Sequence, residues 1–248
     1  MLASEASSPI DLTPQRVRHA IVPRPVTVAA VTTLSPAFRS VRFVGESLAG
    51  FTSLGFDDHV KLVVPPHVDG DLVMPPPGEG RIAFPRGAIV RDYTPRSYSN
   101  GERWLDVEFS LHENGPMADW ARAAKPGAKA ILGGPKGSMV VPLGYDWHLF
   151  LGDESAMPAI ARRLEELPAN AKAIAVIETR SADDRRSFAT KALLDLRWVD
   201  IGASDLLATI ASTLTLPKGN GYAWAAGESA AMKLVREAFR ARSEIVSE

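Results

Sequence analysis

The sequence predicts a two-part fold: an antiparallel β-barrel over residues 1–145, followed by a parallel-sheet α/β unit over residues 146–248. From about residue 25 to residue 140, short extended segments alternate with proline and glycine, which is typical of antiparallel sheets and small barrels. From Trp147 onward, strands alternate with amphipathic helices, which indicates a parallel sheet covered on both faces. A chain of 248 residues is long enough for two compact units of ordinary size.

Four extended segments form the predicted barrel. They cover residues 26–34, 38–44, 59–65 and 104–111. In the last segment, apolar side chains alternate with Asp106 and Glu108, so we expect a half-buried strand with these two carboxylates facing away from the apolar side. The stretch 65–85 is rich in proline and glycine and is expected to be a loop.

The second unit is predicted as a repeated strand-and-helix order that begins near Tyr145. The expected strands cover residues 148–153, 171–179, 195–200 and 222–227. One expected helix carries Met157, Ile160, Ala161, Leu164 and Leu167 on one face. The other expected helices begin near Ser187, cover residues 204–213 and begin at Glu228. In the last helix Met232, Val235 and Phe239 share one face, as expected for a helix packed on a sheet.

Composition and charge exclude several kinds of function. A net charge of -1 argues against general nucleic-acid binding, which needs a concentrated basic surface. The absence of cysteine excludes disulfides, thiolate catalysis and iron–sulfur clusters. The five histidines show no metal-ligand spacing, so no metal site is predicted. The first ten residues lack an apolar core, so we expect neither a signal peptide nor a membrane anchor, and a cytoplasmic location.

The segment 91–99, RDYTPRSYS, carries the most informative polar pattern. A flavin at a barrel strand needs a cation for its pyrophosphate, an aromatic or apolar surface for the isoalloxazine and a small donor near N5. Arg91, Tyr93 and Thr94 can supply these three groups. The alternative interpretation is an edge strand with ordinary exposed polar side chains, because such a strand can show the same spacing of residues by chance.

Two further segments of the barrel half have a cofactor-binding and a structural interpretation. In 114–120, Gly115 permits close backbone approach and Pro116 suits a first helical position, so the following amides would point at an anion. A capped surface helix is the alternative. In 134–138, GPKGS, the backbone and Ser138 can contact phosphates, or the segment is a plain tight turn.

Two strand-to-helix turns of the second unit lie where a nicotinamide coenzyme usually binds. The first is 152–158, GDESAMP, which lacks the common glycine repeat and places Asp153 and Glu154 where they would repel phosphates unless they cap a helix. The second is Gly227 and Glu228, for which an acidic first helical turn is the structural alternative.

Five segments, in order, resemble motifs of the siderophore-interacting protein family, relatives of ferredoxin reductases. They are Arg91-x-Tyr93-Thr94-x-Arg96, 112–121, 133–138, 151–160 and the segment from Trp224. The resemblance covers the chain from about His59 to Phe239. Lys136 stands where the family motif has arginine.

The resemblance implies a monomeric, FAD-dependent enzyme that uses NADH or NADPH to reduce ferric siderophores, with Tyr93 and Thr94 as catalytic residues. The implied cofactor-binding residues are Arg91, Asp92, Tyr93, Thr94, His112, Gly115, Pro116, Met117, Ala118, Trp120, Gly137, Ser138, Asp153, Glu154, Ser155, Ala156, Gly227 and Glu228. Siderophores carry anionic oxygens, so Lys61, Lys136 and Arg96 are candidate substrate-binding cations. A solvated surface group is the simpler alternative for each lysine.

Two alternative functions stay open at this point. One is an NAD(P)H-dependent flavin or ferredoxin-type reductase with a different acceptor, and the other is a siderophore-binding protein without turnover. The coenzyme also stays open, because Glu178 can accept hydrogen bonds from a ribose, whereas Arg180, Arg185 and Arg186 can pair with a 2′-phosphate.

Overall fold

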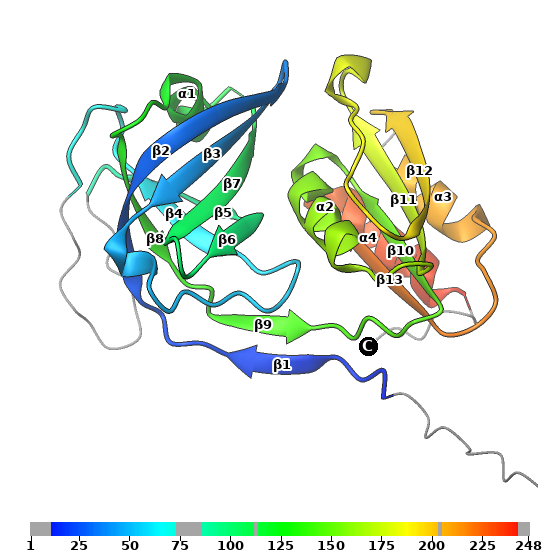
Figure 1. Cartoon of the computed structure of the whole chain (residues 1–248). Coiled ribbons are helices and arrows are strands. Elements are labelled where there is room, and N and C mark those ends of the chain that lie inside the picture. Colours follow the sequence, from blue (N-terminus) through cyan, green and yellow to red (C-terminus); the bar gives the residue numbers. More distant parts are fainter. Residues whose placement is uncertain (1–10, 73–85, 112–113, 203–204, 243–248) are drawn as a thin grey trace, which may run out of the picture.

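The computed structural model describes residues 11–72, 86–111, 114–202 and 205–242. Within these residues, a seven-stranded antiparallel sheet comes first and a four-stranded parallel sheet second, with a separate two-stranded ribbon (Figure 1). The predicted fold class is therefore confirmed, while the division at residue 145 stays a prediction. Of the predicted loop over 65–85, residues 73–85 lie outside the described part of the chain.

The antiparallel sheet curves into a half-barrel, with strand order β5-β4-β8-β2-β3-β7-β6. Its elements are β2 (Pro23–Ser35), β3 (Phe38–Val44), the 3-10 helix η1 (Glu46–Leu48), β4 (Val60–Val64), β5 (Ile89–Tyr93), β6 (Ser97–Ser99), β7 (Trp104–Ser110) and β8 (Lys129–Gly133). Alternate side chains such as Val41, Phe43 and Leu62 are buried inside the half-barrel, because successive strand residues face opposite sides. Helix α1 (Pro116–Ala123) packs its apolar face on this core.

Strand β7 is buried on both faces, so the prediction of a half-buried strand is wrong. Asp106 is 9% exposed and Glu108 is 8% exposed. Asp106 accepts two hydrogen bonds of 2.8 Å from the guanidinium of Arg42. Glu108 forms ion pairs with Arg96 and Arg186. Both carboxylates tolerate burial because guanidinium donors replace the water that they lose.

Strands β1 (Gln15–Arg18) and β9 (Gly137–Val140) form the ribbon, which runs below the two sheets in Figure 1. Their antiparallel register pairs Val17 with Ser138 and Arg18 with Gly137. A Cβ atom at Gly137 would lie 2.6 Å from the Val17 carbonyl oxygen, so glycine is required for this close approach. The hydroxyl of Tyr145 donates to the carbonyl oxygen of Leu12 at 2.6 Å and holds the start of the ribbon.

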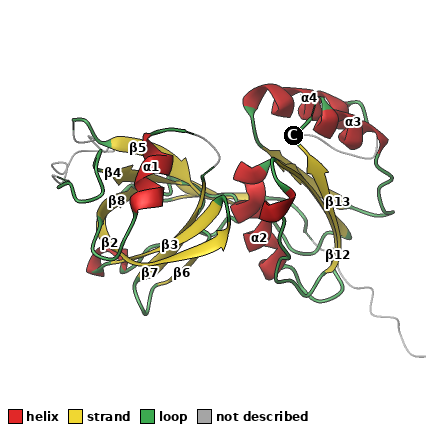
Figure 2. Cartoon of the chain, turned by 90° about the horizontal axis from the view of Figure 1, so that it is seen from above, coloured by secondary structure: helices red, strands yellow, loops and turns green. Residues whose placement is uncertain are grey.

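The parallel sheet has the strand order β12-β11-β10-β13. Its elements are β10 (Trp147–Gly152), the 3-10 helix η2 (Glu154–Ala156), α2 (Met157–Glu166), β11 (Lys172–Thr179), the 3-10 helix η3 (Ala182–Asp184), β12 (Leu193–Asp200), α3 (Leu206–Thr213), β13 (Gly221–Ala226) and α4 (Ser229–Arg240). Helix α2 packs on one face, and α3 and α4 pack on the other (Figure 2). None of the helices in the described residues is long and apolar enough to span a membrane.

The predicted helix from Ser187 is wrong. After η3 the chain forms no helix or strand before β12. Phe188 stacks on Trp198 with ring centroids 5.9 Å apart, and the hydroxyl of Thr190 donates to the carbonyl oxygen of Leu164 in α2 at 2.6 Å. These tertiary contacts hold the segment in a non-helical conformation and outweigh its local helix propensity.

The two sheets share apolar packing where they meet. Phe38 and Phe56 of the first half belong to the same buried cluster as Phe150 of β10 and Ile160 of α2. The Phe56 ring lies 6.1 Å from that of Phe150 and 5.3 Å from that of Trp224, measured between centroids. This packing holds the start of β3 and the segment before β4 against the parallel sheet.

Candidate functional site

The predicted flavin strand β5 lies at one edge of the antiparallel sheet. Arg91 is exposed, and its Nη1 atom donates to the carbonyl oxygen of Val90 at 2.8 Å, which leaves further guanidinium donors for an anion. The Tyr93 ring packs against Phe109 with centroids 4.6 Å apart. Thr94 directly follows the strand and is half-buried. The structure therefore places the cation, the ring and the hydroxyl along one strand edge.

Helix α1 begins beside this strand and packs against β5. Gly115 is the N-cap residue and Pro116 is the first helical residue. A Cβ atom at Gly115 would meet nothing within 4 Å, so there is open space at the helix start. The free amides of a helix N-terminus bind anions, and this one lies next to the strand that carries Arg91.

The side chains of two predicted cofactor residues of α1 lie in the core. Met117 is 4% exposed and Trp120 is 2% exposed, and both pack in the half-barrel. They share one helix face because they are three positions apart, and that face is the apolar one. Their side chains therefore anchor the helix that carries Gly115. Of the remaining predicted residues, Ala118 is half-buried and His112 lies outside the described residues.

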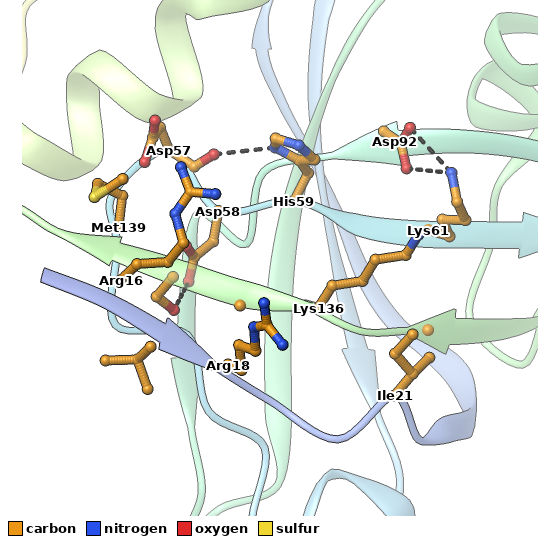
Figure 3. A pocket seen from close by; sticks show the side chains of 14 residues that line it. Arg16, Arg18, Ile21, Asp57, Asp58, His59, Lys61, Asp92, Lys136 and Met139 are labelled. Carbon is orange, nitrogen blue, oxygen red and sulfur yellow. Dashed lines mark hydrogen bonds and ion pairs between the residues drawn. The ribbon is translucent and has the colours of Figure 1, made fainter. Parts of the chain in front are cut away.

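A pocket of about 790 Å³ opens between β4, the turn after β8 and the ribbon (Figure 3). Its lining residues are Arg16, Val17, Arg18, Ile21, Asp57, Asp58, His59, Lys61, Asp92, Gly133, Lys136, Gly137, Ser138 and Met139. The pocket thus brings the predicted substrate residues Lys61 and Lys136 together with the predicted cofactor residues Asp92, Gly137 and Ser138. Because β4 pairs with β5, the pocket adjoins the predicted flavin strand.

The charges on the pocket wall are partly balanced. Lys61 Nζ lies 2.9 Å and 3.1 Å from the two carboxylate oxygens of Asp92. Asp57 accepts a hydrogen bond of 3.2 Å from the indole of Trp224 in β13. Burial raises the pKa of Asp57, and the hydrogen bond from Trp224 opposes that rise. Trp224 thereby connects the pocket to the parallel sheet.

Ser138 is held by hydrogen bonds within this wall, and its contact with a cofactor stays a prediction. It is 2% exposed. Its hydroxyl donates to Asp58 at 2.5 Å, accepts from the amide of Leu54 at 3.0 Å and lies 2.8 Å from His19 Nε2. These partners occupy the hydroxyl. Its neighbour Gly137 is likewise required by the approach of β1, as described above.

Asp153 joins the carboxyl ends of β10 and β13. One of its oxygens accepts from the amide and the hydroxyl of Ser155 at 2.8 Å and 2.6 Å, and the other accepts from the amide of Glu228 at 2.9 Å. A Cβ atom at Gly227 would lie 2.6 Å from Asp153, so glycine is required there. The predicted residues Asp153, Ser155, Gly227 and Glu228 do meet at this edge. The carboxylate acts as a cap, so amide donors stabilise its negative charge.

The neighbouring Glu154 is buried and supports the next strand end. It is 5% exposed and accepts from the amide of Arg180 at 2.6 Å. The predicted residue Ala156 is also buried, at 2% exposed. Burial, and to a lesser degree Asp153, raises the pKa of Glu178 at the end of β11. The Arg180 side chain is 52% exposed and 3.7 Å from Glu154, so it can reach a ligand at this edge.

Arg96 lies outside the pocket and connects the two sheets. Its guanidinium forms two hydrogen bonds with Glu165 of α2, one of them 2.8 Å long, and lies 3.2 Å from Glu108 of β7. The Arg96 side chain is 15% exposed. The structure therefore separates Arg96 from Lys61 and Lys136. The Arg96 guanidinium is instead bound by the carboxylates of Glu108 and Glu165.

Arg162 of α2 is a buried cation that the sequence reasoning missed, and it is 8% exposed. It donates to the hydroxyl and the carbonyl oxygen of Ser53 at 2.8 Å and 2.7 Å, and to the carbonyl oxygen of Pro95 at 3.0 Å. Pro95 directly follows Thr94, so α2 holds the end of the flavin strand. Helix α2 also contains Arg163, Glu165 and Glu166, so no local signal distinguished Arg162 from a surface arginine.

Comparison with known proteins identifies the family. The family model described as "Siderophore-interacting FAD-binding domain" matches residues 27–139, and the one described as "Siderophore-interacting protein" matches residues 145–248. The NADPH-dependent ferric-chelate reductase of Escherichia coli is 37% identical over 233 residues, which are 92% of this chain and 91% of that protein. The chain belongs to the siderophore-interacting protein family.

Two further relatives of this siderophore-interacting protein support the assignment. The ferric vibriobactin reductase ViuB of Vibrio cholerae is 31% identical over 217 residues, covering 83% of this chain and 80% of that protein. The crystal structure of a siderophore utilization protein from T. fusca superposes with a TM-score of 0.87 and is 32% identical, covering 95% of this chain and 92% of that chain.

This siderophore-interacting protein is accordingly a flavin oxidoreductase with an FAD-binding half-barrel. Its residues fit the cofactor, because an exposed guanidinium at Arg91, the open start of α1 and the half-buried Thr94 lie along one edge. In the described part of the chain, no group of three histidine, aspartate or glutamate side chains gathers as a metal site.

Proposed function

We propose that this protein oxidises NADPH through bound FAD and reduces ferric siderophores in the cytoplasm, where NADPH is available, and so releases ferrous iron. The observation that carries the proposal is the pocket that holds Lys61 and Lys136 next to the flavin strand. A cationic wall favours an anionic acceptor at that position. The names ferric-chelate reductase and ferric vibriobactin reductase of two relatives support the same acceptor class.

In this proposal, residues 1–145 hold the flavin and residues 146–248 hold the nicotinamide coenzyme. Arg91 and the amides at the start of α1 bind the pyrophosphate, the Tyr93 ring supports the isoalloxazine and the Thr94 hydroxyl donates near N5. FAD, when bound, supplies the conversion of a two-electron hydride donor into single electrons. Ferrous iron is held less well than ferric iron by oxygen donors, so reduction loosens the chelate.

The nicotinamide coenzyme is proposed to bind at the carboxyl ends of β10, β11 and β13. Asp153 holds two turns of this edge together, and the exposed Arg180 is the candidate partner of the NADPH 2′-phosphate. We propose that the protein is a monomer. Light scattering of the purified protein tests the oligomeric state.

The test is anaerobic mixing of the NADPH-reduced, FAD-loaded protein with ferric siderophores and a ferrous-iron trap. We expect fast flavin reoxidation with matching formation of trapped ferrous iron. Slow reoxidation by every ferric siderophore, with fast reoxidation by ferredoxin or flavodoxin, would establish a reductase with another acceptor. A protein that binds ferric siderophores but does not become reduced by NADPH would be a non-catalytic binder.

Replacing Lys61 and Lys136 by alanine tests the acceptor side. We expect the KM for ferric siderophore to rise by roughly 3-fold to 10-fold while FAD content stays unchanged, because exposed charge pairs contribute about 0.2–1 kcal/mol each. The ion pair with Asp92 makes Lys61 the weaker contributor of the two. An unchanged KM would contradict the assignment of these lysines.

A further inference from the structure

We propose that Asp57, in the segment before β4, is a general acid that donates a proton to a siderophore oxygen when the iron is reduced. The inference rests on the proposed function and adds a catalytic residue to it. An oxygen that stays anionic continues to hold ferrous iron, whereas a protonated oxygen leaves the metal, so a proton donor beside the chelate speeds release.

Asp57 lies where the pocket meets the parallel sheet. It lines the same cavity as Lys61, and Figure 3 shows Asp57 and Asp92 at opposite ends of the row of labelled side chains. One oxygen of its carboxyl group accepts from the indole of Trp224 in β13 at 3.2 Å. The ring of the preceding residue, Phe56, packs 5.3 Å from the Trp224 ring, measured between centroids. Packing therefore holds both the carboxyl group and its donor in place.

The second carboxyl oxygen of Asp57 is available to a ligand. Among the described residues, Trp224 is the side chain that donates to this group, and no lysine or arginine forms an ion pair with it. Asp57 is half-buried, so it borders both the apolar packing and the cavity. The oxygen that does not bind Trp224 can therefore carry a proton and donate it to a ligand oxygen.

The other two carboxyl groups of the pocket wall are engaged by protein donors. Lys61 donates to both oxygens of Asp92. Asp58 is 4% exposed and accepts from the hydroxyls of Ser53 and Ser138 at 2.8 Å and 2.5 Å. Neither group can turn a proton toward a ligand in the cavity, which leaves this role to Asp57.

The surroundings of Asp57 favour its protonated form. Burial raises the pKa of the Asp57 carboxyl, and the hydrogen bond from Trp224 opposes that rise. Of the neighbouring charged side chains, Asp58 raises the pKa of Asp57 and His59 lowers it. The other charged or titratable groups around the carboxyl are Arg16 and Arg18 of β1, Lys136 of the turn after β8 and Tyr222 of β13. A protonated acid on this wall also does not repel an anionic chelate.

The proposed step moves one electron and one proton. The iron changes from ferric to ferrous by gaining one electron from the reduced protein. The O–H bond of the Asp57 carboxyl group breaks, and an O–H bond forms at a siderophore oxygen as that oxygen leaves the iron. The carboxylate then takes a proton from the solvent, which restores the acid for the next electron.

The experiment compares the FAD-loaded wild-type protein with Asp57→Asn. Asparagine keeps an oxygen that can accept from Trp224 but has no acidic proton. Asp195→Asn on β12 is the matched control, because it makes the same change on an exposed side chain at the opposite edge of the parallel sheet.

Three probes separate proton transfer from electron transfer and binding. A ferric tris-catecholate needs both an electron and protons to release its iron. Ferricyanide accepts one electron and keeps its ligands, so it needs no proton. A gallium tris-catecholate measures binding without turnover, because gallium(III) resembles ferric iron in charge and size but is not reduced.

We expect Asp57→Asn, once reduced by NADPH, to be reoxidised by the ferric tris-catecholate roughly 100-fold more slowly, which is the lower end of the usual contribution of a general acid. Reoxidation by ferricyanide and FAD content should match the wild type. The gallium probe should bind the variant as tightly as the wild type, or roughly 2-fold more tightly, because a source of negative charge is removed. The control variant should behave like the wild type with all three probes.

The pH dependence gives a second test. Wild-type reoxidation by the ferric tris-catecholate should slow as the pH rises through the Asp57 pKa, because the acid acts only when protonated, and Asp57→Asn should lack this change. Trp224→Phe should move the change to higher pH, since the hydrogen bond that it removes lowers the pKa of Asp57.

An unchanged rate in Asp57→Asn, equal slowing with ferricyanide, or weaker binding of the gallium probe would each overturn the role of Asp57. Loss of the pH dependence in His59→Gln, with its retention in Asp57→Asn, would assign the proton to His59 instead. The proposed function fails separately, if no ferric siderophore reoxidises the reduced wild-type protein. A protein whose wild type and Asp57→Asn variant reduce ferric siderophores equally fast would keep its function and lose this acid.

Discussion

Removing Arg162 tests how α2 supports the flavin strand. The substitution Arg162→Met keeps the aliphatic stem but removes the donors to the Ser53 hydroxyl, the Ser53 carbonyl and the Pro95 carbonyl. The residue is 8% exposed, so water reaches these acceptors poorly. Its ion pair with Glu166, 3.0 Å long, is lost as well.

The magnitude follows from the acceptors that are left behind. A buried acceptor without its donor costs about 1–3 kcal/mol, and a bond to a charged donor lies at the upper end. The Ser53 carbonyl keeps a bond of 3.1 Å from the Tyr98 hydroxyl, which reduces its share. We therefore expect the free energy of unfolding to fall by about 3–5 kcal/mol.

Urea unfolding followed by tryptophan fluorescence, at saturating FAD, measures this loss. FAD affinity should weaken too, because Pro95 directly follows Thr94. Arg162→Lys should lie between wild type and Arg162→Met, since one ammonium group reaches fewer of the three acceptors. Arg236→Met on the surface of α4 is the control and should change stability by less than about 0.5 kcal/mol. A loss below about 1 kcal/mol with unchanged FAD affinity would refute the role of Arg162.

Three other predictions concern single residues. His148 is buried, and burial together with Arg163 lowers its pKa from 6.5 to about 4. The unfolded chain therefore binds a proton that the native protein does not, so unfolding free energy should fall by up to about 3 kcal/mol between pH 6.5 and pH 4. His148→Phe should flatten that dependence in urea titrations, and an unchanged slope would exclude His148 as its source. Gly137→Ala should displace β1 and raise the KM for siderophore with FAD content unchanged, whereas wild-type kinetics would contradict the need for close approach. Arg180→Gln should raise the KM for NADPH by roughly 10-fold and leave NADH unaffected, and equal changes for both coenzymes would argue against a 2′-phosphate contact.

The sequence by itself determined the fold class and most elements, because local periodicity reports which side of a strand or helix is apolar. The helical spacing of Met232, Val235 and Phe239 in α4 matches the face that packs on the sheet. The alternation in β7 did not reveal that Asp106 and Glu108 are buried as well. The motif on β5 likewise located the strand edge at which Arg91 and Thr94 lie. These features depend on residues that are close together in the chain, so the sequence alone is enough to predict them.

Only the tertiary structure decided which polar groups are paired. Arg162 and its partner Ser53 are separated by 109 positions, and Arg96 meets Glu165 across 69 positions, so no local pattern indicates either contact. Ion pairs and hydrogen bonds of this kind form after the elements pack, because packing removes the water that would otherwise solvate each group. The same physical reason turned Arg96 into a bridge between β7 and α2, bound to Glu108 and Glu165.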